Sequence, residues 1–138
     1  MAREILFRGI DDDTGGWVYG SFCMDALEQM HGPSDIPGFI RFFDKAKGKM
    51  QMREVDRETV GQFTGCLDAN ERRIFEGDIC RYHDPLISGT TDYEVVWFPE
   101  GSQWGVRELG SSGIYIDHLD DYFCLHCEVV GTIFDNRT

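Results

Sequence analysis

The sequence predicts a mainly β protein, α+β at most, and three observations support this prediction. Sixteen of the 138 residues are glycine, well above the average usage of about 7%. Ten Phe, five Tyr and three Trp supply the aromatic side chains that are enriched in strands. Short apolar segments alternate with turns containing Gly, Asp or Asn, as expected for strands joined by tight connections. The hydrophobic content of 41% suffices for a compact core.

The N-terminal β-rich portion, residues 1–56, should contain two β-hairpins. EILFRGI at residues 4–10 and WVYGSF at residues 17–22 flank the polar connection DDDTGG, which is typical of a hairpin. FIRFFD at residues 39–44 and KMQMREV at residues 49–55 flank AKG in the same way.

The connection between these two hairpins contains Met24, Leu27 and Met30 at helical spacing before a Gly-Pro break. This pattern predicts a short helical turn or a surface loop. Asp56 should then open a polar turn that ends the first portion.

The second portion, residues 57–138, should contain about five short strands. VGQFTG precedes the turn LDAN, in which Asp68 and Asn70 can bond the backbone of their own turn. RRIFEGDICRY follows, and the Gly77-Asp78 step allows this strand to bend sharply. YEVVWF and WGVREL lie on either side of PEGSQ, and CLHCEVVGTIF supplies the last strand. Short strands with Gly bends suit a small, strongly curved barrel.

Four phrases give the chain a family resemblance. DRETVGQFTGCLDANERRIFEGDICR at residues 56–81, with EILFRG, GGWVYG and CEVVGTIFDN, resembles the YopX family of small phage and prophage proteins. The resemblance implies a C-terminal SH3-like barrel and a bacterial host cell, and it brings no assigned activity. The chain departs from the family pattern at Glu71, where a Gly is frequent, and over residues 24–37.

The net charge of -12 disfavours nucleic-acid binding by the surface as a whole, because an acidic protein repels the phosphate backbone. The acidic residues are dispersed, which favours a solvated surface over a mimic of DNA. No apolar run approaches the roughly 20 residues that span a bilayer, and the N-terminus lacks a signal peptide pattern. We therefore expect a cytoplasmic protein that does not bind membranes.

Cys124 and Cys127 form the C-x-x-C motif of zinc knuckles and redox pairs. If residues 124–134 form one strand, the two sulfurs point to opposite faces, so packed thiols are the favoured interpretation. A site completed by His118 or His83 is the alternative. Five cysteines, an odd number in a cytoplasmic chain, disfavour a disulfide framework.

The acidic segments offer two further candidates for a cation site. Asp11 and Asp13 with two glycines echo the start of a calcium loop, but Phe22 occupies the place of the closing acid, so an Asx-type turn is expected. A second acidic cluster, Asp117, Asp120 and Asp121, is interpreted as solvated surface. We expect no metal and no cofactor.

Catalysis is not predicted, and no catalytic residue is assigned. The four histidines are scattered, no Ser or Cys lies in a nucleophile elbow, and the GSSG segment at residues 110–113 suggests a flexible loop. Because the absence of a motif is weak evidence, a hydrolase or metalloenzyme is kept as a third class of function. The favoured function is a non-catalytic module that assembles with itself or with a host or phage protein.

Two surfaces are candidates for binding. Trp97 and Trp104 lie on either side of the PEGSQ turn and, with Phe98, are expected to form an aromatic contact surface on one rim of the barrel. The alternative is a nucleic-acid strip in FIRFFDKAKGK, where aromatic residues are interleaved with cations. The cations of this strip are Arg41, Lys45, Lys47 and Lys49.

Overall fold

The computed structural model describes residues 4–24, 38–110 and 117–135. The chain divides into two compact units, Met1–Gln62 and Phe63–Thr138, whereas the sequence analysis divides it between residues 56 and 57. Both units consist mainly of antiparallel strands, and the described ranges contain one short helix. The predicted mainly β class is therefore confirmed.

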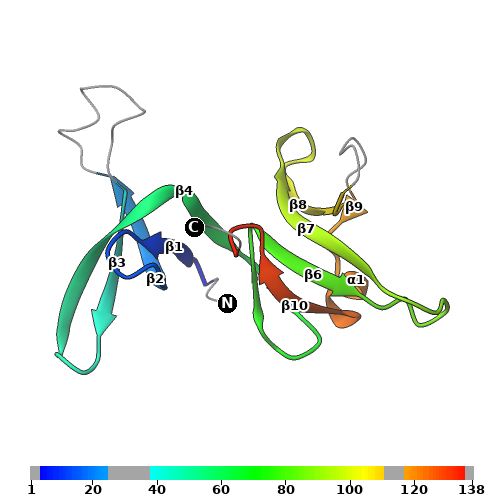
Figure 1. The fold of residues 1–138 in the computed structure, drawn as a ribbon, viewed down its shortest axis with the longest axis horizontal. Coiled ribbons are helices and arrows are strands. Elements are labelled where there is room, and N and C mark those ends of the chain that lie inside the picture. The colour runs from blue at the N-terminus through cyan, green and yellow to red at the C-terminus, as the bar shows by residue number, and fades with distance from the viewer. Residues whose placement is uncertain (1–3, 25–37, 111–116, 136–138) are drawn as a thin grey trace. The chain divides into compact units, whose positions relative to one another are not determined.

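The elements follow one another along the described chain as labelled in Figure 1. The strands of the first half are β1 (Phe7–Asp11), β2 (Trp17–Met24), β3 (Gly38–Asp44) and β4 (Lys49–Leu67), of which β4 continues into the second unit. The later elements are β5 (Arg73–Phe75), β6 (Asp78–Tyr82), β7 (Thr91–Phe98), a 3₁₀ turn (Pro99–Gly101), β8 (Gln103–Glu108), β9 (Asp117–His118), α1 (Asp121–Leu125) and β10 (Cys127–Thr132).

Both hairpins predicted for the first unit are present. β1 pairs with β2, and β3 pairs with the first part of β4, in each case antiparallel. In the β1–β2 connection, Asp11 Oδ1 accepts hydrogen bonds from the backbone N–H groups of Asp13 at 2.8 Å and Thr14 at 3.3 Å. This is the Asx-type turn that the sequence predicts in place of a calcium loop.

The four strands of the first unit form a closed ring of pairings. β2 pairs with β1 and with β3, and β4 pairs with β3 and then with β1. Val55 marks the change of partner, since it lies opposite Gly38 of β3 and Asp11 of β1. The side chains of Ile40 and Val55 are buried, and a Cβ at Gly9 would lie only 3.0 Å from the Val55 side chain, a tight contact. Each strand therefore has a neighbour on both sides.

The polar turn predicted at Asp56 is not a separate connection, because β4 runs without interruption through this position. The register between β1 and β4 shifts here, and Asp56 Oδ1 accepts a hydrogen bond from the N–H of Glu58 at 3.0 Å. Thr59 then donates its hydroxyl to the Asp56 carbonyl at 2.6 Å. The turn-forming residues thus produce a bulge within a strand, because the pairing with β1 resumes after them.

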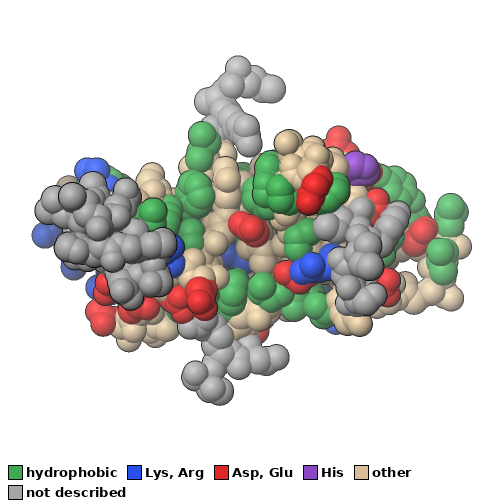
Figure 2. All heavy atoms as spheres, turned by 90° about the horizontal axis from the view of Figure 1, so that it is seen from above, with side chains coloured by type: hydrophobic (Ala, Val, Ile, Leu, Met, Phe, Trp, Pro, Cys, Tyr) green, Lys and Arg blue, Asp and Glu red, His purple; other side chains and the backbone are tan. Residues whose placement is uncertain are grey.

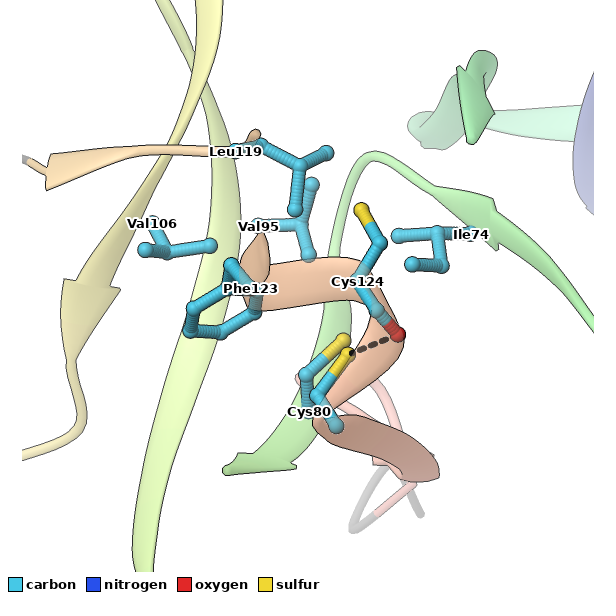
Figure 3. Packing of buried hydrophobic residues seen from close by; sticks show 8 residues of the cluster. Ile74, Cys80, Val95, Val106, Leu119, Phe123 and Cys124 are labelled. Carbon is cyan, nitrogen blue, oxygen red and sulfur yellow. Dashed lines mark hydrogen bonds between the residues drawn. The ribbon is translucent and has the colours of Figure 1, made fainter. Parts of the chain in front are cut away.

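The second unit contains a five-stranded antiparallel sheet in the order β10-β6-β7-β8-β9. Its core, shown in Figure 3, brings Ile74, Val95 and Val106 against Phe123 and Cys124 of α1. Burying one large apolar side chain stabilises a fold by about 1.5–3 kcal/mol. The helix is therefore held by its apolar contacts and by an N-cap at Asp120, whose carboxylate accepts from the N–H of Phe123 at 2.9 Å.

The segment RRIFEGDICRY was predicted as one bent strand, and this prediction is wrong in detail. β5 ends at Phe75 and pairs with β4, whereas β6 begins at Asp78 and pairs with β7 and β10. Gly77 adopts a φ of +90°, which a residue with a side chain rarely takes, and the chain turns here and changes its partners. The Asp78 carboxylate accepts from the N–H of Phe75 at 2.7 Å and closes the turn.

The prediction of a single last strand over residues 124–134 is also wrong, because α1 includes Cys124 and β10 begins only at Cys127. The argument that the two sulfurs point to opposite faces of a strand therefore does not apply. Both cysteines are buried in the same core.

Some predictions fall on segments outside the described residues. These are the helical turn or loop predicted between Met24 and Gly38 and most of the GSSG segment. Among the described residues no helix is both long enough and apolar enough to cross a membrane.

The Asp11 carboxylate should make the stability of the first unit depend on acid pH. The pKa of the Asp11 carboxyl is lowered below 3.8, most strongly by the hydrogen bond from the N–H of Asp13. The N–H of Thr14 and the guanidinium of Arg53, whose Nε is 3.0 Å from Asp11 Oδ2, lower it further, while burial acts in the opposite direction. A lowered pKa stabilises the fold above pH 3.8, and this contribution is lost as the pH falls through the folded-state pKa. Asp11→Asn should therefore unfold at lower urea concentration than the wild type at pH 6.

This difference between Asp11→Asn and the wild type should shrink as the pH falls from 6 toward 2 and the Asp11 carboxylate takes up its proton. Urea titrations at several pH values measure it. The adjacent, exposed Asp12 provides the control substitution Asp12→Asn. A difference that persists unchanged at pH 2 would contradict the assignment.

Candidate binding surfaces and thiol cluster

One face of the β3–β4 hairpin carries large apolar side chains that are exposed. Phe43 is 56% exposed, Met50 is 48% exposed and Met52 is 55% exposed. Phe43 lies directly opposite Met50, and Arg41 lies opposite Met52, so these four side chains share one face of the two strands. We call Phe43, Met50 and Met52, together with Cys23 of β2, the outer hairpin face.

Cys23 joins this face through the β2–β3 pairing. It lies opposite Phe39, two residues from Arg41 on β3, and its sulfur is 4.0 Å from the Met52 sulfur. The opposite face of β3 carries Ile40, which is fully buried. Successive side chains of β3 point to opposite faces of the sheet, so one face contributes to the core and the other is an exposed apolar surface.

The four cations of the predicted strip are all exposed on this same hairpin. Arg41 lies on β3, Lys45 and Lys47 lie in the turn, and Lys49 opens β4. Residues 38–55 carry five Lys or Arg and two Asp or Glu, whereas the rest of the chain carries eight and 23. The acidic side chains, red in Figure 2, are scattered over the face that it shows. The hairpin is therefore a basic segment of an acidic protein.

The predicted aromatic surface consists of one exposed ring and two partly buried ones. Trp97 on β7 and Trp104 on β8 lie directly opposite each other, with ring centroids 5.0 Å apart in an edge-to-face arrangement. Trp97 is 44% exposed, whereas Trp104 packs against the core and Phe98 is half-buried. The contact that this pair presents to solvent is therefore mainly the Trp97 indole.

A polar depression of about 710 Å³ lies on the second unit, beside β6 and β7. Arg81 and Asp92 line it, and the Arg81 guanidinium donates two hydrogen bonds to the Asp92 carboxylate, with N···O distances of 3.0 and 3.2 Å. His83, Glu108 and Glu128 also line the depression. Because Asp92 already engages the guanidinium, and the other charged neighbours are mostly acidic, the arrangement does not favour an anion.

The four cysteines of the second unit form two neighbouring pairs. Cys66 of β4 is half-buried and packs against the core that contains the buried Cys124. Hydrogen bonding with the Cys124 thiol lowers the pKa of Cys66 to about 7, and the same interaction, followed by burial, raises the pKa of Cys124. Cys80 and Cys127 form the second pair, and their hydrogen bond, followed by burial, raises the pKa of Cys80. Figure 3 shows the Cys124 sulfur pointing toward Ile74 in the core.

The described residues contain no group of three or more His, Cys, Asp or Glu that could hold a metal ion. In the DHLDD segment, Asp120 caps α1, and Asp117 accepts from the N–H of His118 at 2.9 Å. The imidazole of His118 is 2.7 Å from the Gln103 side-chain oxygen. Asp117, His118 and Asp120 are thus engaged in hydrogen bonds within the protein.

Sequence reasoning identified the cations of the hairpin but missed its apolar face. Phe42 and Phe43 are adjacent, so the sequence does not show which of them points inward, and only the pairing register settles this. The Cys66–Cys124 pair was also missed, because the two residues are far apart in the sequence. The C-x-x-C motif drew attention to Cys124 and Cys127 instead.

The family comparison covers nearly the whole chain. The model of the YopX protein family matches residues 6–138, a range that includes both units except for the first five residues. No curated protein matches the chain. The resemblance noted from the four sequence phrases is therefore confirmed, and the chain belongs to the YopX family.

Proposed function

We propose that the protein is a non-catalytic phage or prophage accessory module, acting in the bacterial cytoplasm, that assembles with itself through the outer hairpin face. The observation that carries this proposal is the exposure of Phe43, Met50 and Met52 side by side on one sheet face. Contiguous exposed apolar side chains mark interaction sites in soluble proteins. Methionine adapts its shape to a partner surface, and aromatic residues are enriched at interface centres.

A second copy of the chain is the partner that the charge distribution favours. The cations lie on the same hairpin as the apolar face, while the rest of the chain has a large excess of carboxylates. A basic hairpin of one copy would therefore be attracted to the acidic surface of the next copy. Two unlike surfaces meeting in this way give a head-to-tail contact, which produces a ring or a longer chain of subunits.

Strand addition is a less favourable route to assembly. Each strand described in the first unit already has two neighbours. In the second unit, the Asp68 carboxylate accepts from the N–H of Val129, and the N–H of Ala69 donates to the Cys127 carbonyl, both at 2.9 Å. These bonds cover the outer edge of β10. Assembly through the side chains of a sheet face does not require a free strand edge, so it is the favoured route.

Light scattering against salt concentration tests the proposal. At 50 mM NaCl the mass should exceed the 15.8 kDa of one chain, and it should fall toward this value at 500 mM NaCl as the charges are screened. The Debye length shrinks from roughly 14 Å to roughly 4 Å over this range. A protein that remains a monomer at low salt and at about 100 μM would contradict self-assembly and leave a host or phage protein as the partner.

The exposed Trp97 is a second contact within the same proposal. Its ring is held by Trp104, so little conformational freedom is lost when a partner covers it. The second unit is proposed to be an SH3-like barrel. Support comes from the return of the last strand, β10, onto the first strand of the sheet, β6, directly after the one-turn helix α1.

The alternative function is related to nucleic acids. The exposed Arg41, Lys45 and Lys47 beside the exposed ring of Phe43 favour it, since single strands bind to grooves that combine cations with stacking rings. A fluorescent single-stranded oligonucleotide should then bind at low salt and dissociate as salt rises. The acidic surface could instead act as a DNA mimic, in which case the protein should compete with DNA for a host DNA-binding protein.

A further inference from the structure

The outer hairpin face carries three sulfur-containing side chains that solvent reaches. Met50 and Met52 of β4 are about half exposed, and Cys23 of β2 is exposed as well. The Cys23 sulfur is 4.0 Å from the Met52 sulfur, so these two atoms are in contact across β3. The four cysteines of the second unit, in contrast, are half-buried or buried. A dissolved oxidant therefore has access to the sulfur atoms of the outer hairpin face.

We propose that Met50 and Met52 form a site of reversible oxidation, at which a peroxide converts the two thioethers into sulfoxides and thereby weakens self-assembly. This inference rests on the proposed function, since it concerns the regulation of the same face. A methionine side chain is apolar and adapts to a partner surface, whereas its sulfoxide is polar. An interface that covers the sulfoxide has to remove water from the new oxygen, which costs free energy.

The chemistry needs one peroxide for each methionine. The thioether sulfur attacks one oxygen of hydrogen peroxide, an S–O bond forms and the O–O bond breaks. The proton on the transferred oxygen passes to the departing hydroxide, which leaves as water. The sulfur loses two electrons and the peroxide gains them. A methionine sulfoxide reductase reverses the step with two thiols, which become a disulfide as the oxygen leaves in water.

Arg41 gives Met52 a neighbour that suits its oxidised form. It lies directly opposite Met52 on β3 and is exposed. Opposite side chains of an antiparallel pair have Cβ atoms roughly 4.5–5.5 Å apart, so the guanidinium can donate to a sulfoxide oxygen on Met52. An Arg41 engaged in this way is less available to the acidic surface of the next copy. Oxidation of Met52 thus acts on both the apolar and the charged part of the contact.

Peptide mass spectrometry and light scattering on the same peroxide-treated sample test the proposal. The full chain is used in a Cys23→Ser background, which avoids disulfides between molecules through this exposed thiol. Cleavage at arginine releases residues 42–53, which contain both methionines. We expect each of them to gain one oxygen and the dissociation constant of the assembly to rise about 10- to 100-fold. Treatment with a methionine sulfoxide reductase should restore the original mass at 50 mM NaCl.

The matched control is Met50→Leu/Met52→Leu in the same background. Leucine keeps an apolar side chain of similar volume and has no sulfur to oxidise. This variant should assemble before peroxide treatment and stay assembled after it, so any effect of oxidation elsewhere in the chain is seen separately.

Met24 of β2 is the internal reference for the rate of oxidation, because it is exposed but is not part of the outer hairpin face. Assembly covers Met50 and Met52, so both should be oxidised more slowly at 50 mM NaCl than at 500 mM NaCl, where the subunits separate. The rate at Met24 should be the same at both salt concentrations.

The outcomes separate this inference from the proposed function. An assembled protein whose mass stays unchanged after both methionines have gained an oxygen would overturn the inference and leave self-assembly intact. Equal dissociation of the Leu variant after peroxide treatment would do the same. A protein that is a monomer before peroxide treatment would overturn the proposed function and, with it, the effect of oxidation on assembly.

Discussion

The double variant Phe43→Glu/Met52→Glu should be a monomer under conditions in which the wild type self-associates. Full burial of a large apolar side chain contributes about 1.5–3 kcal/mol, and both side chains are about half exposed in the single chain, so covering each of them contributes roughly half of this. Placing carboxylates there removes this contribution and leaves charges to be desolvated against an acidic partner surface. The apolar contribution of the two side chains together, about 1.5–3 kcal/mol, corresponds to a dissociation constant weakened about 10- to 100-fold.

The matched control for this variant is Leu86→Glu/Ile87→Glu. Leu86 and Ile87 are 89% and 67% exposed, and they lie in the β6–β7 connection of the second unit, whereas the outer hairpin face belongs to the first unit. The control changes the net charge by the same amount and also removes two exposed apolar side chains. Light scattering at 50 mM NaCl should give the wild-type mass for the control and the monomer mass for the hairpin variant.

Both double variants should keep the far-ultraviolet circular dichroism of the wild type, because exposed positions usually change stability by less than about 0.5 kcal/mol each. Equal loss of assembly in the two variants would point to net charge instead of a specific face. An unchanged mass for the hairpin variant would remove the outer hairpin face from the proposal and leave Trp97 as the next surface to substitute.

The two hairpins of the first unit could be predicted because their signals are local. Alternating apolar residues on either side of DDDTGG and AKG define two strands and a turn without reference to the rest of the chain. The closed ring of strands could not be predicted in this way. It depends on the second half of β4 pairing with β1 across a bulge at Asp56, and the same polar residues that indicate a turn also form a bulge.

The helix α1 shows a different limit of sequence reasoning. Asp120 and Asp121 are the acidic residues expected at a helix start, yet a five-residue helix is too short for its periodicity to be distinguished from a strand. The error changed the interpretation of the cysteines, because a strand separates Cys124 from Cys127 and a helix followed by a strand brings both into the core.

Asp68→Ala should destabilise the second unit by about 3 kcal/mol. The Asp68 side chain is 4% exposed and accepts three backbone hydrogen bonds, from Asn70 at 2.8 Å, Arg72 at 2.9 Å and Val129 at 2.9 Å. Each of these three part-buried hydrogen bonds contributes about 1 kcal/mol. The sequence predicted the bonds within the LDAN turn but not the one to β10, which fastens the turn to the last strand.

Urea unfolding followed by tryptophan fluorescence measures this effect. In a Trp17→Phe background the signal comes from Trp97 and Trp104, both in the second unit. Asp84→Ala is the control, because the Asp84 carboxylate accepts one bond in an exposed turn, from the N–H of Leu86 at 2.8 Å. Its cost should stay near 1 kcal/mol.

Asp68→Asn separates the turn from the attachment to β10. The amide keeps one carbonyl oxygen, which can serve the two N–H groups of the turn, and directs its NH₂ group at the N–H of Val129. Two donors then face each other, so the variant should lie between Asp68→Ala and the wild type. If it unfolds like the wild type, the bond to β10 contributes little, and the edge of that strand would be more open to a partner than the proposed mode of assembly requires.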